Sequence, residues 1–215
     1  MAGAEEINMR WCFYLIWKIE SLVGKIQFMI SPNQKKMLAL KQKDSGTKLE
    51  IGGGETPRLK QQQFINIDIR NIPEVDIVAS ITDLNKTMFP GTVSHIFSRH
   101  TLEHLASYEI DIAIRNLANI SSEGTIIEII VPNIRYHALQ YLSAQFNSKN
   151  QKHALAGFNG WQRCYGENYW DTHKSSYDKN LLISTLSHHF NFKHHTFISK
   201  RYKHLHFIGV VQSVN

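Results

Sequence analysis

A glycine turn followed by an acid is the first feature of this sequence that could do chemistry. The β-prone run 48–51 (KLEI) leads directly into the glycines 52–54, and a second β-prone run, 64–69 (FINIDI), carries Asp68 near its end. Glycine allows a sharp turn at the carboxyl end of a buried strand and lets a ligand lie against the main chain. An acid at the end of the second strand can accept hydrogen bonds from the two hydroxyls of a ribose. The pattern predicts a nucleoside site, although a flexible loop would explain the glycines alone equally well.

The turn departs from the pattern of dinucleotide-binding proteins. It lacks the third glycine of the GxGxxG kind, and Pro57 interrupts the start of the helix that would hold a pyrophosphate at its amino terminus. The connection from Gly54 to Phe64 is also too short for a full crossover helix. A ligand with a nucleoside but no phosphate fits these features better than NAD or a flavin dinucleotide.

A second acid follows the third predicted strand, 76–79. Asp83 is placed there to accept a hydrogen bond from an adenine amino group, and the backbone N–H of Leu84 is placed to meet a ring nitrogen. A turn or helix N-cap residue is the alternative interpretation of Asp83.

Two histidines follow the fourth predicted strand, 93–98, at the edge of the sheet where chemistry collects in open α/β folds. We expect a helix to begin here, so that His100 and His104 share a face and Glu103 lies between them. His100 is the first candidate for a base or orienting residue, and His173 could close over the pair. A satisfied core or capping histidine is the alternative for each. Two histidines at this spacing also occur in metal sites, but no third ligand is evident nearby, so we expect no metal.

The segments LEIGGG, INIDI, DIVASITDL, IFSRHTLEHL and GTIIEIIVPN, in this order, resemble the class I S-adenosylmethionine-dependent methyltransferases. They are most similar to the compact, methyltransferase type 11-like proteins, which have a short first crossover and an HxLEHL element after the fourth strand. The resemblance covers residues 48–133 well and the remainder weakly. It implies an α/β, Rossmann-like fold with a mostly parallel seven-stranded sheet flanked by helices, and S-adenosylmethionine as the cofactor, with S-adenosylhomocysteine as its product. It also implies the cofactor-binding residues Glu50, Gly52, Gly53, Gly54, Asp68, Ile69, Asp83, Leu84 and Arg99.

The second half of the sequence is expected to complete the sheet. Apolar spacing predicts a crossover helix over 102–120, and the apolar run 125–131 predicts a fifth, central strand. The resemblance adds a helix around 180–188 and an antiparallel pair at about 193–199 and 204–211. The intervening residues 136–176 are rich in aromatic residues and glycine, which suits a substrate lid or wall; a packed surface loop is the alternative.

The amino-terminal residues 1–47 are predicted to be an extension to the methyltransferase domain, 48–215. The segment 9–30 is rich in large apolar residues but contains Lys18, Glu20 and Lys25, so that it is a poor membrane span. We expect a helix packed on the domain or on a second subunit, with an interfacial membrane helix as the alternative. A basic, polar connector follows it over 31–47.

Composition limits the function classes. The chain has 215 residues, 42% of them hydrophobic, with only two cysteines, and indicates one globular domain of cytoplasmic, or membrane-peripheral, location. A net charge of +6 favours a solvated basic face over a nucleic-acid groove. The expected function is methyl transfer to a hydroxyl or amine of a small-molecule acceptor such as a sugar. The apolar amino-terminal helix is compatible with a homodimer. The alternatives are an RNA or protein methyltransferase and a cofactor-binding relative without turnover.

Overall fold

The computed structural model describes residues 4–30, 46–57, 62–85, 88–89, 93–162, 169–197 and 203–215. The predicted basic connector lies almost wholly outside the described residues, as do residues 163–168 of the aromatic and glycine-rich segment and the end of the strand predicted for 193–199.

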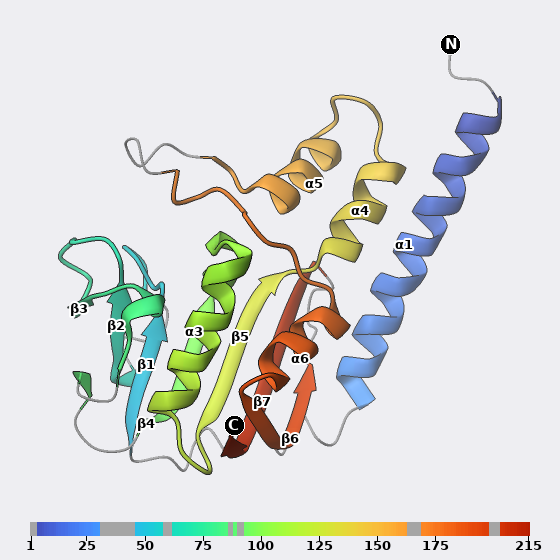
Figure 1. Ribbon diagram of the computed structural model, residues 1–215. Coiled ribbons are helices and arrows are strands. Elements are labelled where there is room, and N and C mark those ends of the chain that lie inside the picture. Colours follow the sequence, from blue (N-terminus) through green and yellow to red (C-terminus); the bar gives the residue numbers. More distant parts are fainter. Residues whose placement is uncertain are drawn as a thin grey trace.

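A seven-stranded sheet forms the centre of the molecule, with the strand order β3-β2-β1-β4-β5-β7-β6 (Figure 1). Its strands are β1 (Thr47–Ile51), β2 (Phe64–Asp68), β3 (Ile77–Val78), β4 (Val93–Arg99), β5 (Ile126–Pro132), β6 (Phe190–Phe197) and β7 (His204–Val214). Pairing is parallel from β3 to β5, whereas β7 runs antiparallel to both β5 and β6. The predicted mostly parallel seven-stranded sheet is therefore confirmed.

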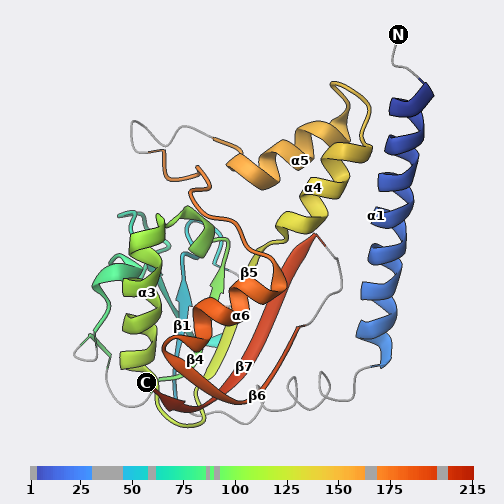
Figure 2. The same ribbon diagram turned by 45° about the vertical axis from the view of Figure 1, so that its right-hand side comes forward.

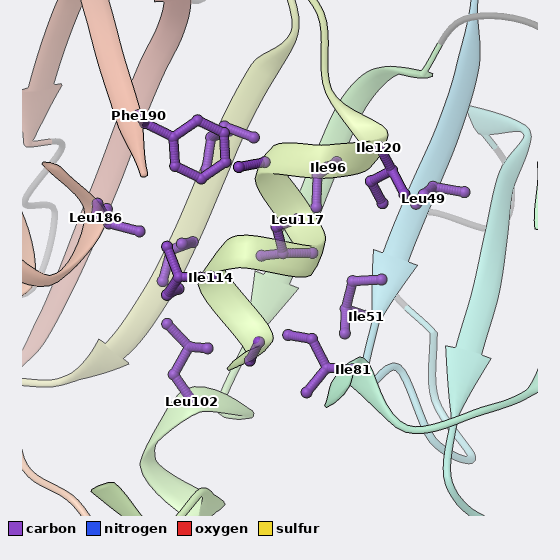
Figure 3. Packing of buried hydrophobic residues seen from close by; sticks show 14 of the residues in the cluster. Leu49, Ile51, Ile81, Ile96, Leu102, Ile114, Leu117, Ile120, Leu186 and Phe190 are labelled. Carbon is purple, nitrogen blue, oxygen red and sulfur yellow. The ribbon is translucent and has the colours of Figure 1, made fainter. Parts of the chain in front are cut away.

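Two helices, α3 (Ser107–Ile120) and α6 (Lys179–Ser187), cover one face of the sheet (Figures 1 and 2). Ile114 and Leu117 of α3 are fully buried and lie between the helix and the sheet, near Ile96 of β4 (Figure 3). The central strands β4 and β5 are buried along most of their length, which explains their nearly continuous apolar sequences. This packing fixes the carboxyl ends of the strands, where the candidate site lies.

The segment after β4 differs from the predicted continuous helix over 102–120. A 3-10 turn, η4 (Leu102–His104), comes first, and α3 begins only at Ser107. The backbone N–H of Ala106 donates to Oε2 of Glu109 at 2.7 Å, so that the Glu109 side chain caps the start of α3. The apolar spacing thus predicted the helix but not its first boundary.

The residues after β5 form two helices, α4 (Ile134–Ser143) and α5 (Lys149–Asn159), above the carboxyl ends of the strands (Figure 1). Their first turns are capped by side chains, since Asn133 accepts from the N–H of Arg135 and Ser148 from that of Gln151. Gly160 ends α5 with a positive φ of 74°, and a Cβ there would lie 1.8 Å from the carbonyl oxygen of Asp171. The chain can therefore return toward the sheet only through a glycine.

The amino-terminal helix α1 (Ala4–Ile30) lies along α4 (Figures 1 and 2). The rings of Trp17 and Tyr136 are 5.6 Å apart between centroids, and Nε of Arg135 donates to the carboxylate of Glu20 at 3.0 Å. Other large apolar side chains of α1 are exposed, namely Met9, Trp11, Tyr14, Leu15, Ile16, Ile19, Leu22 and Val23. Among the described residues, none of the helices has the length and apolar character needed to cross a membrane.

Candidate active site

A cavity of about 400 Å³ opens at the carboxyl ends of β1, β2 and β4. This is the point where the strand order reverses between β1 and β4, which is where ligands bind in open α/β sheets. Its lining includes five of the residues predicted for the site: Gly52, Asp68, Ile69, His100 and His104. The parallel sheet thus gathers side chains from three separate segments of the sequence at one edge.

The glycine turn is shaped by contacts with neighbouring protein atoms. Gly52 has a φ of 75°, and a Cβ there would lie 2.2 Å from Oγ1 of Thr101, which itself donates to the carbonyl of Ile51 at 3.0 Å. A Cβ on Gly53 would lie 2.3 Å from Oδ1 of Asn66. The glycines are therefore required for packing the turn against the segments after β4 and within β2, and not only for the approach of a ligand as predicted.

Asp68 ends β2 at the wall of the cavity and is held by a neighbouring arginine. Its Oδ1 accepts from the backbone N–H of Arg70 at 3.0 Å and from Nε of the same residue at 3.1 Å. Arg70 also lines the cavity and lies 3.7 Å from a carboxylate oxygen of Glu55. Arg70 is not among the residues predicted for the site, although its position two residues after the predicted ribose-binding acid is the signal in the sequence that points to it.

The predicted adenine-binding residues lie differently from the expectation. Asp83 ends the 3-10 turn η2 (Ile81–Asp83) with an exposed side chain, and Leu84 is buried in the core. Neither is part of the described lining of the cavity, whereas Ser80 and Ile81 are. Ser80 caps η2 by accepting from the N–H of Thr82, which turns the chain so that residues 79–81 border the cavity.

Four further predicted residues lie outside the described lining: Glu50, Gly53, Gly54 and Arg99. Glu50 is buried within β1, and a Cβ on Gly54 would meet the guanidinium of Arg70. Arg99 is the last residue of β4. The structure therefore does not place these four residues at the cavity surface.

The two histidines after β4 do not share a helical face, contrary to the prediction. His100 has a φ of 52°, a left-handed conformation that prevents a helix from starting there. Nδ1 of His100 lies 2.7 Å from Oε1 of Glu103, and its ring packs edge-on against His204 with centroids 4.8 Å apart. His104 instead lies against His173, with centroids 5.1 Å apart. Both His100 and His104 nevertheless border the cavity.

Glu103 lies beneath these histidines and is only 1% exposed. Burial alone would raise the pKa of its carboxyl, but the hydrogen bond from His100 and the charges of His100 and His104 lower that pKa below its usual value overall. The carboxylate is therefore ionised, although it is almost completely enclosed by protein.

His173 belongs to the same cluster and is not part of the described lining of the cavity. Its Nδ1 lies 3.1 Å from the carbonyl oxygen of Gly157 in α5. Burial lowers the pKa of His173, so that the imidazole is mostly neutral near pH 7. The residue thus lies beside Glu103 and His104 and does not close over the cavity.

The segment that follows α5 supplies one wall of the cavity through Trp170, Asp171 and Lys174. The backbone N–H of Lys174 donates to the carbonyl of Glu103 at 2.8 Å, which ties this wall to the turn after β4. Part of the aromatic and glycine-rich segment therefore borders the cavity, as a wall would, while most of the rest forms α4 and α5.

No family model and no curated protein matches the sequence. The fold, in contrast, is similar to those of many solved structures. An S-adenosylmethionine-dependent methyltransferase from Clostridium acetobutylicum superposes with a TM-score of 0.54 at 11% identity, and the match covers 88% of this chain and 92% of that one.

Two further solved structures are similar to the fold of this chain. The 1,6-didemethyltoxoflavin-N1-methyltransferase of Burkholderia thailandensis, solved with its substrate and S-adenosylhomocysteine, has a TM-score of 0.50 at 11% identity, over 99% of this chain and 92% of that one. The methyltransferase domain of a bacterial Hen1 protein has a TM-score of 0.50 at 11% identity, over 83% of this chain and 99% of that one. The chain therefore has the class I methyltransferase fold.

Proposed function

We propose that this protein is an S-adenosylmethionine-dependent methyltransferase that acts on a hydroxyl or amine of a small molecule, such as a sugar. The observation that carries this proposal is the cavity at the reversal point of the sheet, bordered by the glycine turn at Gly52 and by the carboxylate of Asp68. The fold alone would not support it, because one fold can carry many functions.

The residues present fit the cofactor. The cavity volume of about 400 Å³ is in the range of small-molecule and cofactor sites, roughly 300–1,000 Å³. Asp68 offers carboxylate oxygens to a ribose, Gly52 exposes main chain, and Ala79, Ser80 and Ile81 form a partly apolar wall for an adenine. Glu50, Gly53, Gly54, Asp83, Leu84 and Arg99 remain in the proposed binding region around this lining. Bound there, S-adenosylmethionine would supply an electrophilic methyl group.

The contacts of Arg70 with Asp68 restrict how a ribose could bind to that carboxylate. Because its guanidinium and backbone N–H both donate to Oδ1 of Asp68, a ribose hydroxyl must use Oδ2 or displace the side chain of Arg70. The contact between Nη2 of Arg70 and Oδ2 of Asp68 is long, at 3.5 Å, so that this oxygen is the more available of the two.

The acceptor side is formed by His100 and by the wall of Trp170, Asp171 and Lys174. When Nδ1–H of His100 donates to Glu103, its Nε2 carries the lone pair and can accept a proton from an acceptor. This arrangement of a histidine oriented by a buried carboxylate supports a general base for a hydroxyl acceptor. His104 and His173 lie beside it in the same cluster.

The wall that Trp170, Asp171 and Lys174 form on one side of the cavity supports a small acceptor. An RNA or protein acceptor is the alternative, and a methyltransferase domain of a Hen1 protein is among the structural neighbours. A binding protein without turnover is the remaining alternative.

A homodimer through α1 is a further part of the proposal. Trp11, Leu15 and Leu22 are more than half exposed, and such apolar surface commonly marks an interaction site. Sedimentation of the full chain with and without lipid vesicles separates a dimer from contact with a membrane surface.

Calorimetric titration tests the cofactor. We expect S-adenosylmethionine and S-adenosylhomocysteine to bind with micromolar affinity, and NAD and ATP not to bind under the same conditions. An acceptor screen with sugars, amine metabolites, RNA and peptides would follow, with release of S-adenosylhomocysteine as its readout. Failure of both sulfur nucleosides to bind a folded, ligand-free protein would contradict the proposal, and transfer only to RNA or peptide would overturn the small-molecule assignment.

A further inference from the structure

A cluster of three side chains that could bind a metal adjoins the cavity through His104. Glu103 and His104 come from the turn η4, and His173 comes from the segment after α5, far away in the sequence. One ligand atom from each residue lies within 4.8 Å of the others. Two imidazole nitrogens and one carboxylate oxygen at this separation can converge on a single ion.

The hydrogen bonds of both imidazoles leave the same nitrogen available. Nδ1 of His104 lies 3.1 Å from the carbonyl oxygen of Thr172, and Nδ1 of His173 lies 3.1 Å from that of Gly157. A carbonyl oxygen only accepts, so Nδ1 carries the hydrogen in each ring and the lone pair of the neutral imidazole is on Nε2. Histidines that bind metals are usually held in this way, by a second-shell acceptor on the other nitrogen.

Glu103 supplies the second, independent observation. Its Oε1 accepts from Nδ1 of His100, but its Oε2 is buried and has no hydrogen-bond partner among the described residues. The residue is 1% exposed, so that solvent does not satisfy this oxygen. A buried carboxylate oxygen without a partner is costly, and a cation bound beside it would compensate for that cost.

Backbone contacts hold the two ligand-bearing segments together. The N–H groups of Lys174 and Ser175 both donate to the carbonyl of Glu103, at 2.8 and 3.1 Å, and Oγ of Ser175 donates to the carbonyl of Leu102 at 3.0 Å. The arrangement of Glu103, His104 and His173 is therefore fixed by the fold and does not require the ion to assemble it.

We propose that Glu103, His104 and His173 bind a divalent first-row transition metal ion. The donor set favours Zn²⁺ and its neighbours in this series over Mg²⁺ or Ca²⁺, which prefer sites made wholly of oxygen ligands. Three protein ligands leave at least one coordination position open, as in catalytic zinc sites. His104 also borders the cavity, so that a ligand bound there would lie next to the proposed site.

The role of the ion rests on the proposed function. An acceptor hydroxyl coordinated at the open position would have a lowered pKa, and its proton would pass to His100, which lies next to Glu103 at the cavity. The ion would therefore favour a hydroxyl over an amine among the acceptors proposed above. Binding of the ion itself does not depend on any transfer reaction.

Metal titration of the full chain tests the site. The protein is stripped with a chelator, dialysed, and titrated with Zn²⁺ and Mg²⁺ by calorimetry and with Co²⁺ by visible absorption. We expect one equivalent of Zn²⁺ or Co²⁺ per chain, a Co²⁺ spectrum typical of nitrogen and oxygen ligands, and no comparable binding of Mg²⁺. Glu103→Gln and His173→Ala should each weaken binding by more than about tenfold.

His194→Ala is the matched control, because His194 is exposed on β6 and belongs to the histidine-rich carboxyl-terminal part. Its variant should bind the ion as the wild type does. If Glu103→Gln fails to fold, as judged by its melting transition, His104→Ala and His173→Ala decide the question. The proposal is overturned if no ion binds, or if binding survives the ligand variants. Loss of that binding in His194→Ala would then assign it to adventitious contacts with exposed histidines.

Titration with S-adenosylhomocysteine on the same samples separates the two proposals. Metal binding without nucleoside binding would contradict the proposed function and leave the metal site intact. Nucleoside binding without metal binding would contradict the metal site and leave the proposed function intact.

Discussion

His100 combines the features of a positioned base in one residue. It borders the cavity, adopts a left-handed backbone conformation, and has its Nδ1 2.7 Å from the buried carboxylate of Glu103. Backbone strain of this kind persists only where the surrounding structure enforces it, and it occurs often at functional sites. This geometry is consistent with the proposed role of His100 in turnover.

Substitution of His100 should reduce turnover and leave cofactor binding nearly unchanged. We expect His100→Ala to lower kcat by about 10²–10⁴-fold, the usual contribution of general acid–base catalysis. The affinity for S-adenosylhomocysteine, measured by calorimetry, should stay close to that of the wild type. His100→Gln checks that the loss does not arise from leaving Glu103 without a donor, and His194→Ala controls for removing a histidine elsewhere. Loss of binding with retained turnover would reverse the assignment.

His137 on α4 makes the protein sensitive to acid. It is 3% exposed, and burial, together with the nearby charge of His153, lowers its pKa from 6.5 to about 4. The unfolded chain then binds more protons than the folded one between pH 6.5 and 4, so that stability falls as the pH falls through this window. By linkage this single group costs on the order of 3 kcal/mol of unfolding free energy at pH 4 relative to pH 7.

A variant with an apolar side chain at this position should lose that pH dependence. We expect the stability of His137→Leu, measured by denaturant unfolding at several pH values, to fall less steeply between pH 6.5 and 4 than that of the wild type. The two curves should differ most at the acidic end, because there unfolding of the wild type exposes the imidazole of His137, which then takes up a proton. Parallel curves for the two proteins would show that His137 does not contribute.

At the scale of elements, the glycine turn between β1 and β2 is the part of the site most sensitive to small changes. Gly52 and Gly124 both have positive φ values, 75° and 89°. A Cβ at Gly52 would overlap the side chain of Thr101, whereas a Cβ at Gly124 would have no neighbour within 4 Å. A side chain at Gly124 therefore introduces backbone strain alone, whereas a side chain at Gly52 adds steric overlap to that strain.

Alanine at these two positions should have different consequences. Gly124→Ala should cost roughly 1–2 kcal/mol of unfolding free energy, the penalty of the left-handed conformation. Gly52→Ala should cost more, because overpacking typically adds about 1–3 kcal/mol, and it should also weaken cofactor binding. Denaturant unfolding and calorimetry measure the two effects. Equal costs at both positions would contradict the close packing of Gly52 against Thr101.

The sequence predicted the elements of the sheet well because their signals are local. Apolar runs marked β4 and β5, and the following turn residues marked their ends, so that the predicted bounds differ from the observed ones by one residue. The start of α3 was predicted too early because the apolar spacing continues through η4. The positive φ of His100, which prevents a helix from starting there, was not evident from the sequence. The pattern also did not indicate that the side chain of Glu109 would cap α3, which begins only at Ser107.

The site was predicted only in part because its other half is assembled by tertiary contacts. Gly52, Asp68 and His100 follow their strands directly, and local patterns could identify them. His173 meets Glu103 only because Gly160 turns the chain back toward the sheet after α5. The expectation of no metal rested on the lack of a third ligand nearby in the sequence, whereas the fold brings His173, the third residue of the proposed site, in from a distant segment.

At the scale of the whole molecule, α1 is joined to the rest mainly through α4. Trp17 is half-buried against Tyr136, whereas Trp11, on the same helix, is 61% exposed. The ion pair between Glu20 and Arg135 adds little, because Arg135 is largely exposed to solvent. Aromatic packing is therefore expected to dominate the attachment of α1.

Replacement of Trp17 should loosen α1 without disturbing the sheet. We expect Trp17→Ala to increase amide hydrogen exchange across α1 and along the facing side of α4, while protection of β4 and β5 stays unchanged. Trp11→Ala removes the same side chain from an exposed position and should change exchange little. Similar exchange in both variants would mean that Trp17 does not anchor the helix.

Calorimetry on one pair of variants tests whether the cofactor binds beside Asp68. Asp68 lies at the cavity wall, and Glu123 lies exposed in the turn before β5 at the opposite edge of the sheet. We expect Asp68→Ala to lose most of the affinity for S-adenosylhomocysteine and Glu123→Ala to keep it. Undiminished binding by a folded Asp68→Ala variant, or absence of binding by the wild type, would contradict the account.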